Sequence, residues 1–64
     1  MTYAVAYSFL MCMVRHRNGA IGQVIDVGRG GRTGVILTVA SGDDMDRISE
    51  MTGRDFLADW TVTA

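Results

Sequence analysis

The 64-residue chain has one cysteine, one histidine and no lysine. Cys12 has no second cysteine to pair with, so an internal disulfide cannot form, and one histidine leaves no cluster for a structural zinc ion. Folding so short a chain costs roughly 100 kcal/mol of conformational entropy, which a core of this size barely offsets. Because neither cross-link is present, we expect association to supply the missing stability, in a homodimer or a higher homo-oligomer, or in a tight complex with a partner.

The chain also lacks a large excess of charge of either sign. Its six arginines and seven acidic residues give a formal net charge of -1 and an isoelectric point of about 5.5. Without a bulk positive field, direct nucleic-acid binding is not expected. The apolar stretch over residues 1–14 has no preceding cationic region and is shorter than the ~20 residues that cross a bilayer. With a single unpaired cysteine, these features predict a cytoplasmic protein with no membrane segment.

A first strand is predicted over residues 2–14. Bulky side chains alternate with small ones throughout this stretch, and a period of two residues places the two kinds on opposite faces of a strand. The face of Ala4, Ala6 and Ser8 is small and apolar, so a second sheet can approach it closely. We expect these three residues to form the oligomer interface.

Two further strands are predicted after a turn at Asn18-Gly19, where both residues tolerate a positive φ. These strands cover residues 20–27 and 33–40, which are rich in β-branched side chains. Gly22 within the second strand indicates a bulge or a close approach of another backbone.

A helix is predicted after the third strand. Ser41 and Asp44 have the spacing of a capping box, and acidic residues near a helix start are favoured by the helix dipole. The apolar residues that follow have helical spacing, and Gly53 is placed to end a helix of about three turns.

The last strand is predicted over residues 56–63, where Phe56 and Trp60 share one face and Leu57 lies on the other. The predicted fold is therefore a single α+β domain over residues 1–64 with elements in the order βββαβ. A small antiparallel sheet of about four strands would carry one short helix packed on one face, because so short a helix is not stable alone.

The chain offers no arrangement for catalysis. His16 lies beside the predicted turn, and Cys12 lies in a strand whose alternation already gives it a packing role, so the two are not expected to act as base and nucleophile. The acidic residues downstream lie at the cap and on the solvated face of the predicted helix, and they lack the spacing of a calcium loop. We expect no enzyme activity, no metal and no cofactor.

The glycine-rich stretch Gly28–Gly34 is not a nucleotide-binding fingerprint. Thr33 occupies the place of the third glycine, a strand is predicted after it in place of a helix, and a Walker loop needs a lysine. Successive glycine amides together with Arg29 and Arg32 could still hold a phosphate or the carboxylates of a partner. A flexible hairpin loop, a protein-binding loop and a phosphate-binding loop all stay open here.

The predicted charges form no single basic patch. Arg15 and Arg17 lie before the second strand, and Arg29 and Arg32 lie after it, so the two pairs are roughly 26 Å apart. The predicted helix is acidic and would complement a basic groove, such as one that normally holds nucleic acid. A solvated helix face is the alternative explanation of these acids.

Taken together, the chain resembles the very small ββαβ proteins that phages and prophages encode. The features that carry this resemblance are the tyrosine-rich stretch Tyr3–Ser8, the turn at Asn18-Gly19, Gly22, the capped short helix and a final strand with Trp60. Several such proteins are counter-defence factors, including anti-CRISPR proteins, which bind a host complex and have no catalytic residues. The predicted third strand and the loop before it depart from this pattern.

Together with the expected self-association, the resemblance implies a non-enzymatic, homo-oligomeric protein that inhibits or sequesters a host protein or ribonucleoprotein complex by occlusion. The predicted contact residues are Arg29, Arg32, Asp43, Asp44, Asp46 and Glu50, with Arg15 and Arg17 as further candidates. Two other functions stay open. The chain could be a small-ligand or nucleotide sponge that uses the loop over residues 28–34, or a structural subunit in which the small face makes an open-ended contact.

Overall fold

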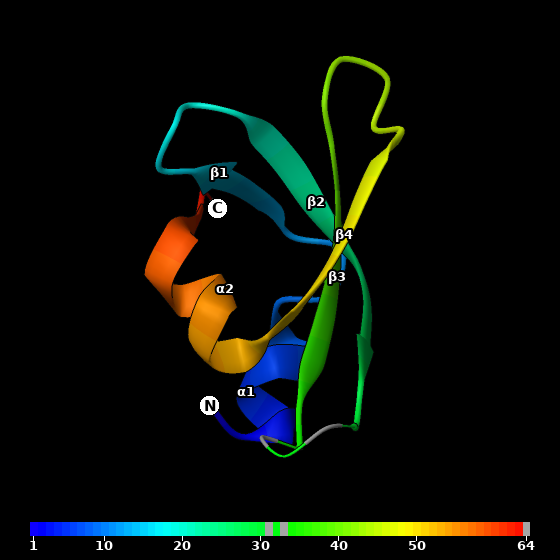
Figure 1. The fold of residues 1–64 in the computed structure, drawn as a ribbon, viewed down its shortest axis with the longest axis vertical. Coiled ribbons are helices and arrows are strands. Elements are labelled where there is room, and N and C mark those ends of the chain that lie inside the picture. Colours follow the sequence, from blue (N-terminus) through cyan, green and yellow to red (C-terminus); the bar gives the residue numbers. More distant parts are fainter. Residues whose placement is uncertain (31, 33, 64) are drawn as a thin grey trace.

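The sheet of this protein is antiparallel and, in the residues described, has five strands in the order β4-β3-β2-β1-β5 (Figure 1). The computed structural model describes residues 1–30, 32 and 34–63. Its elements are α1 (Tyr3–Ser8), β1 (Met13–His16), β2 (Ile21–Gly28), β3 (Ile36–Ser41), β4 (Arg47–Thr52), α2 (Gly53–Asp59) and β5 (Trp60–Val62). The α+β class and the helix packed on an antiparallel sheet are confirmed, whereas the number of strands and the position of the helix differ from the prediction.

The core lies between the sheet and the two helices, on what we call the inner face. Val24 and Val39 are register partners on neighbouring strands, both are fully buried, and Phe56 of α2 and Ala6 of α1 pack into the same cluster. Both helices therefore cover the same face of the sheet, as Figure 1 shows. The opposite face, which we call the outer face, carries no helix of the described chain.

Gly22 marks a close backbone approach, one of the two outcomes predicted for it. A Cβ atom at this position would lie 2.8 Å from the Ala40 carbonyl oxygen, so no side chain fits between β2 and β3 there. A register irregularity lies further along the strand, between Val24 and Asp26. It turns Val27 inward and leaves Ile25 exposed.

The predicted first strand is wrong over most of its length, because residues 3–8 form α1. The Thr2 hydroxyl accepts a hydrogen bond of 3.2 Å from the Val5 N–H, which caps the helix. Ala6 is fully buried, and Tyr3 and Phe9 pack against the core at a spacing of three residues on either side of it. Helical spacing of these residues thus outweighs the alternation of large and small side chains.

The predicted helix after Ser41 is also wrong. Ser41 ends β3, and a tight turn follows in which Gly42 has a φ of 94° and Met45 a φ of 55°. The Met45 N–H donates to the Gly42 carbonyl oxygen at 3.2 Å. This turn sends the chain back as β4, antiparallel to β3, where a helix could not pair.

The second helix instead begins at Gly53, the residue predicted to end one. The Thr52 hydroxyl caps it by accepting a 3.2 Å hydrogen bond from the Asp55 N–H. Of the predicted last strand, only Trp60–Val62 is extended, as β5. Because β4 and β5 are the two edges of the sheet, α2 joins one edge to the other across the inner face. No helix in the described part of the chain is long and apolar enough to cross a membrane.

Candidate functional site

The strand β4 is an edge of the sheet, and exposed carboxylates lie on it and next to both of its ends. All six of its residues pair with β3, from Thr52 opposite Ile36 at one end to Arg47 opposite Ser41 at the other. In the described chain, no backbone hydrogen bond reaches the other side of β4. Alternate N–H and C=O groups of β4 therefore face outward without a partner, over about 16 Å of strand.

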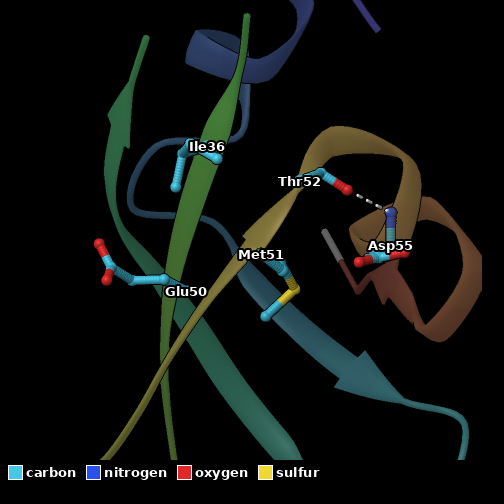
Figure 2. A pocket seen from close by; sticks show the side chains of 5 residues that line it. All are labelled: Ile36, Glu50, Met51, Thr52 and Asp55. Atoms are coloured by element: carbon cyan, nitrogen blue, oxygen red, sulfur yellow. Dashed lines mark hydrogen bonds between the residues drawn. The ribbon is translucent and has the colours of Figure 1, made fainter. Parts of the chain in front are cut away.

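A hollow of about 370 Å³ opens at the end of β4 (Figure 2). It is lined by Ile36, Glu50, Met51, Thr52 and Asp55. Figure 2 shows the carboxylates of Glu50 and Asp55 on opposite sides of β4. The Thr52 hydroxyl is already used in capping α2, so the groups that the hollow offers to a ligand are two carboxylates and apolar wall from Ile36 and Met51.

Three more carboxylates lie at the other end of β4. Asp43, Asp44 and Asp46 are exposed in the turn between β3 and β4, not on a helix as predicted. Together with the two carboxylates of the hollow they form what we call the acidic margin: Asp43, Asp44, Asp46, Glu50 and Asp55. All five side chains are exposed, and none forms an ion pair with another described residue.

Four of the predicted contact residues thus share one edge of the sheet. Arg47 and Arg54 lie among the five carboxylates. Because the carboxylates outnumber these two arginines, the margin as a whole is negative. Asp55 was missed by the sequence analysis, although Thr52 and Asp55 have the same spacing as the pair at Ser41 and Asp44 from which a helix was predicted.

The predicted arginine contacts are not part of the acidic margin; they lie in the loop between β2 and β3, which leads into Ile36 at the hollow. Arg29 follows β2 at the end of the molecule opposite the β3–β4 turn (Figure 1), and its guanidinium lies over the Tyr3 ring at 4.5 Å from the centroid. This cation–π contact ties the loop to α1. Arg32 is exposed in the same loop. The predicted phosphate-binding loop also includes Gly31 and Thr33, which lie outside the described residues.

The arginines before β2 form no patch with those after it, as predicted, because the length of β2 separates them. Arg17 pairs with Asp59 at 3.2 Å, at the far end of α2 from the acidic margin. Arg15 is exposed on β1, where its register partners are Ile21 and Thr61.

The predicted oligomer interface does not exist as one face of a strand. Ala4, Ala6 and Ser8 lie on α1, and Ala6 is fully buried in the core of its own chain. Only Ala4 and Ser8 are exposed. Ala6 therefore cannot touch a second copy.

Cys12 and His16 each have a separate local partner. The Cys12 thiol donates to the Ser8 carbonyl oxygen at 3.7 Å, and the His16 Nδ1 accepts from the Asn18 N–H at 3.1 Å. Within the described residues, no group of three or more His, Cys, Asp or Glu side chains could hold a metal ion.

No protein-family model matches this chain, and neither the curated proteins nor the solved structures compared with it give a match. The acidic margin and the free edge that it borders are therefore interpreted from their own chemistry. What they offer is a row of backbone donors and acceptors, bordered by negative charge and ending in a partly apolar hollow.

Proposed function

We propose that this chain is a non-enzymatic binding protein that adds an extended, basic segment of a partner protein to the free edge of β4. The observation that carries the proposal is the coincidence of an unpaired edge strand with the acidic margin. Added strands bind through main-chain hydrogen bonds, which are independent of sequence. The carboxylates of the margin would make the binding specific for a basic segment.

The hollow at the end of β4 supports this choice of partner. An arginine or lysine side chain that enters it from the side of α2 would lay its apolar stem along Met51. Its cationic end would then reach Asp55, while Glu50 on the other side of β4 would attract another cation of the same segment; neither carboxylate has an ion-pair partner in the described chain.

Occlusion would be the mechanism. A basic segment that is held on β4 is no longer free to bind nucleic acid, so no catalytic step is needed to inhibit its owner. The resemblance to small phage counter-defence proteins extends the proposal to the kind of partner, a host protein or ribonucleoprotein complex in the cytoplasm. Within this proposal Arg29 and Arg32 are not contact residues, because their positive charges would repel a basic segment and the Arg29 guanidinium already lies over the Tyr3 ring.

A homodimer is the second part of the proposal, and the outer face of the sheet supports it. Ile48 and Met13 lie in one row across this face, and Ile21 lies nearby; all three are exposed. Arg15 lies toward one end of the face and Asp26 toward the other. Two copies that pack face to face about a two-fold axis along the row would bring Arg15 of each copy opposite Asp26 of the other, across the usual ~10 Å between sheets.

Amide hydrogen exchange with a defined peptide tests the binding function. The probe is a synthetic peptide of about eight residues, the length of a strand, in which arginine and valine alternate. We expect it to slow exchange at alternate residues of β4 and to leave β5, the other edge, unchanged. A peptide in which glutamate replaces arginine should do neither. Binding without protection of β4, or equal protection of β5, would refute the strand-addition proposal.

A matched pair of variants tests the part played by the margin. Glu50→Gln should lower the affinity for the arginine peptide by about threefold, since exposed charge pairs contribute only about 0.2–1 kcal/mol. Asp59→Asn removes the same charge beside β5, and peptide affinity should stay at the wild-type value. Equal losses in the two variants would mean that net charge, and not the margin, attracts the peptide.

A further inference from the structure

A second hollow lies on the inner face, at the end of the sheet where the β1–β2 and β3–β4 turns meet the core. Its volume is about 190 Å³. Two cross-strand pairs line the hollow, His16 with Trp60 and Ser41 with Arg47. Asn18 of the β1–β2 turn and Ser49 of β4 also line it. None of its lining residues is acidic, although acidic residues outnumber basic ones in the chain.

The β1–β2 turn uses up the acceptor atoms of its own side chains. The His16 Nδ1 accepts from the Asn18 N–H at 3.1 Å, and the Asn18 Oδ1 accepts from the Ala20 N–H at 2.9 Å. The neutral imidazole of His16 must therefore carry its proton on Nε2, and the free end of the Asn18 amide is its NH2 group. Both side chains present donors to the hollow.

The strands β3 and β4 add further donors. Ser41 is only 6% exposed and Ser49 is half-buried, and neither hydroxyl forms a hydrogen bond with another described residue. Arg47 lies beside them and has no ion pair with a described residue. A guanidinium, two hydroxyls, an amide and an imidazole N–H thus surround one small space, and no carboxylate balances them.

We propose that this hollow binds a phosphoryl group, either as inorganic phosphate or as the phosphorylated end of a small molecule. Donors that come from three separate segments, the β1–β2 turn, β3 and β4, suit a tetrahedral oxyanion, which accepts hydrogen bonds from several directions. A space of about six water volumes is enough for one phosphoryl group with a few waters. The two hollows share no lining residue, although Arg47 and Ser49 of this one lie on β4.

The site carries its own reporter. Trp60 is the one tryptophan of the chain, it is 9% exposed, and the His16 ring meets it edge-on at 4.8 Å between centroids. We expect its fluorescence to change with saturation when inorganic phosphate is added at constant ionic strength, with chloride as the balancing anion. A change that never saturates, or one that sodium chloride alone reproduces, would overturn the proposal.

Two arginine variants separate the site from general charge effects. Arg47→Gln should lower the affinity for phosphate at least about tenfold, because hydrogen bonds to charged groups contribute about 1.5–3 kcal/mol. Arg54→Gln makes the same charge change on α2, outside the hollow, and should bind phosphate as the wild type does. Equal affinity in the two variants would overturn the proposal, and circular dichroism checks that both are folded.

Two further arms test the role of the hydroxyls and the class of anion. Ser49→Ala removes one neutral donor and should weaken phosphate by about threefold without a change in the unfolding midpoint. Unchanged affinity would mean that β4 contributes charge alone and that no built phosphoryl site exists. Acetate should not saturate in the range where phosphate does; if it binds equally well, the group recognised is a carboxylate and the phosphoryl assignment is wrong.

Discussion

Phe56 and Leu57 are neighbours with opposite surroundings. Phe56 is 1% exposed, and its ring centroid lies 5.6 Å from that of Phe9, whereas Leu57 is 57% exposed. The sequence predicts correctly that Phe56 and Trp60 face the core together, even though it assigns them to a strand. Residues four apart share a side both in a strand and in a helix, so the facing is predictable where the type of element is not.

A pair of alanine substitutions tests this placement. Phe56→Ala should lower the free energy of unfolding by about 3–5 kcal/mol, because it removes a fully buried ring from the contact between the two helical segments. Leu57→Ala should change it by less than about 1 kcal/mol, since the side chain is mostly in solvent. Urea denaturation measures both. A loss of cooperative folding in Phe56→Ala agrees with the placement, whereas equal effects in the two variants contradict it.

At the scale of elements, the chain contains two similar capping signals and uses one of them. Ser41 with Asp44 and Thr52 with Asp55 have the same spacing, but only Thr52 caps a helix. Residues 42–45 instead turn into a hairpin, which lets β4 pair with β3 along its whole length. A local signal cannot tell these outcomes apart, because the competing pairing is a tertiary interaction.

The cap at Thr52 gives the element-scale prediction. Thr52→Ala should destabilise the protein by about 1 kcal/mol, because the Asp55 N–H loses its acceptor at the start of α2. In a domain of this size that corresponds to a fall of about 4–8 °C in Tm. Thr52→Ser keeps the hydroxyl and should stay close to the wild type in a thermal melt. If both variants lose the same stability, the methyl group and not the cap is responsible.

At the scale of the whole molecule, four of the five acids of the candidate site were predictable and their setting was not. Asp43, Asp44, Asp46 and Glu50 stand out in the sequence as a cluster of charge, whatever element carries them. Their place along a free edge depends on strand order, in which β5 pairs with β1 at the opposite side of the sheet from β4. Pairing between segments so far apart leaves no local pattern to read.

The outer face gives the prediction for the whole molecule. Ile48 and Leu57 are exposed apolar residues of nearly equal exposure, 56% and 57%, but Ile48 lies on the outer face of the sheet and Leu57 on α2. If two copies pack face to face, Ile48→Arg places a charge inside the contact, whereas Leu57→Arg places one in solvent. Light scattering on a sizing column should then give about twice the chain mass for the wild type and for Leu57→Arg, and 7.0 kDa for Ile48→Arg. A wild-type mass of 7.0 kDa at every concentration, or a dimer that Ile48→Arg leaves intact, would rule this face out as the contact. The free edge of β4 lies at the rim of such a dimer, so each copy could still add a basic segment.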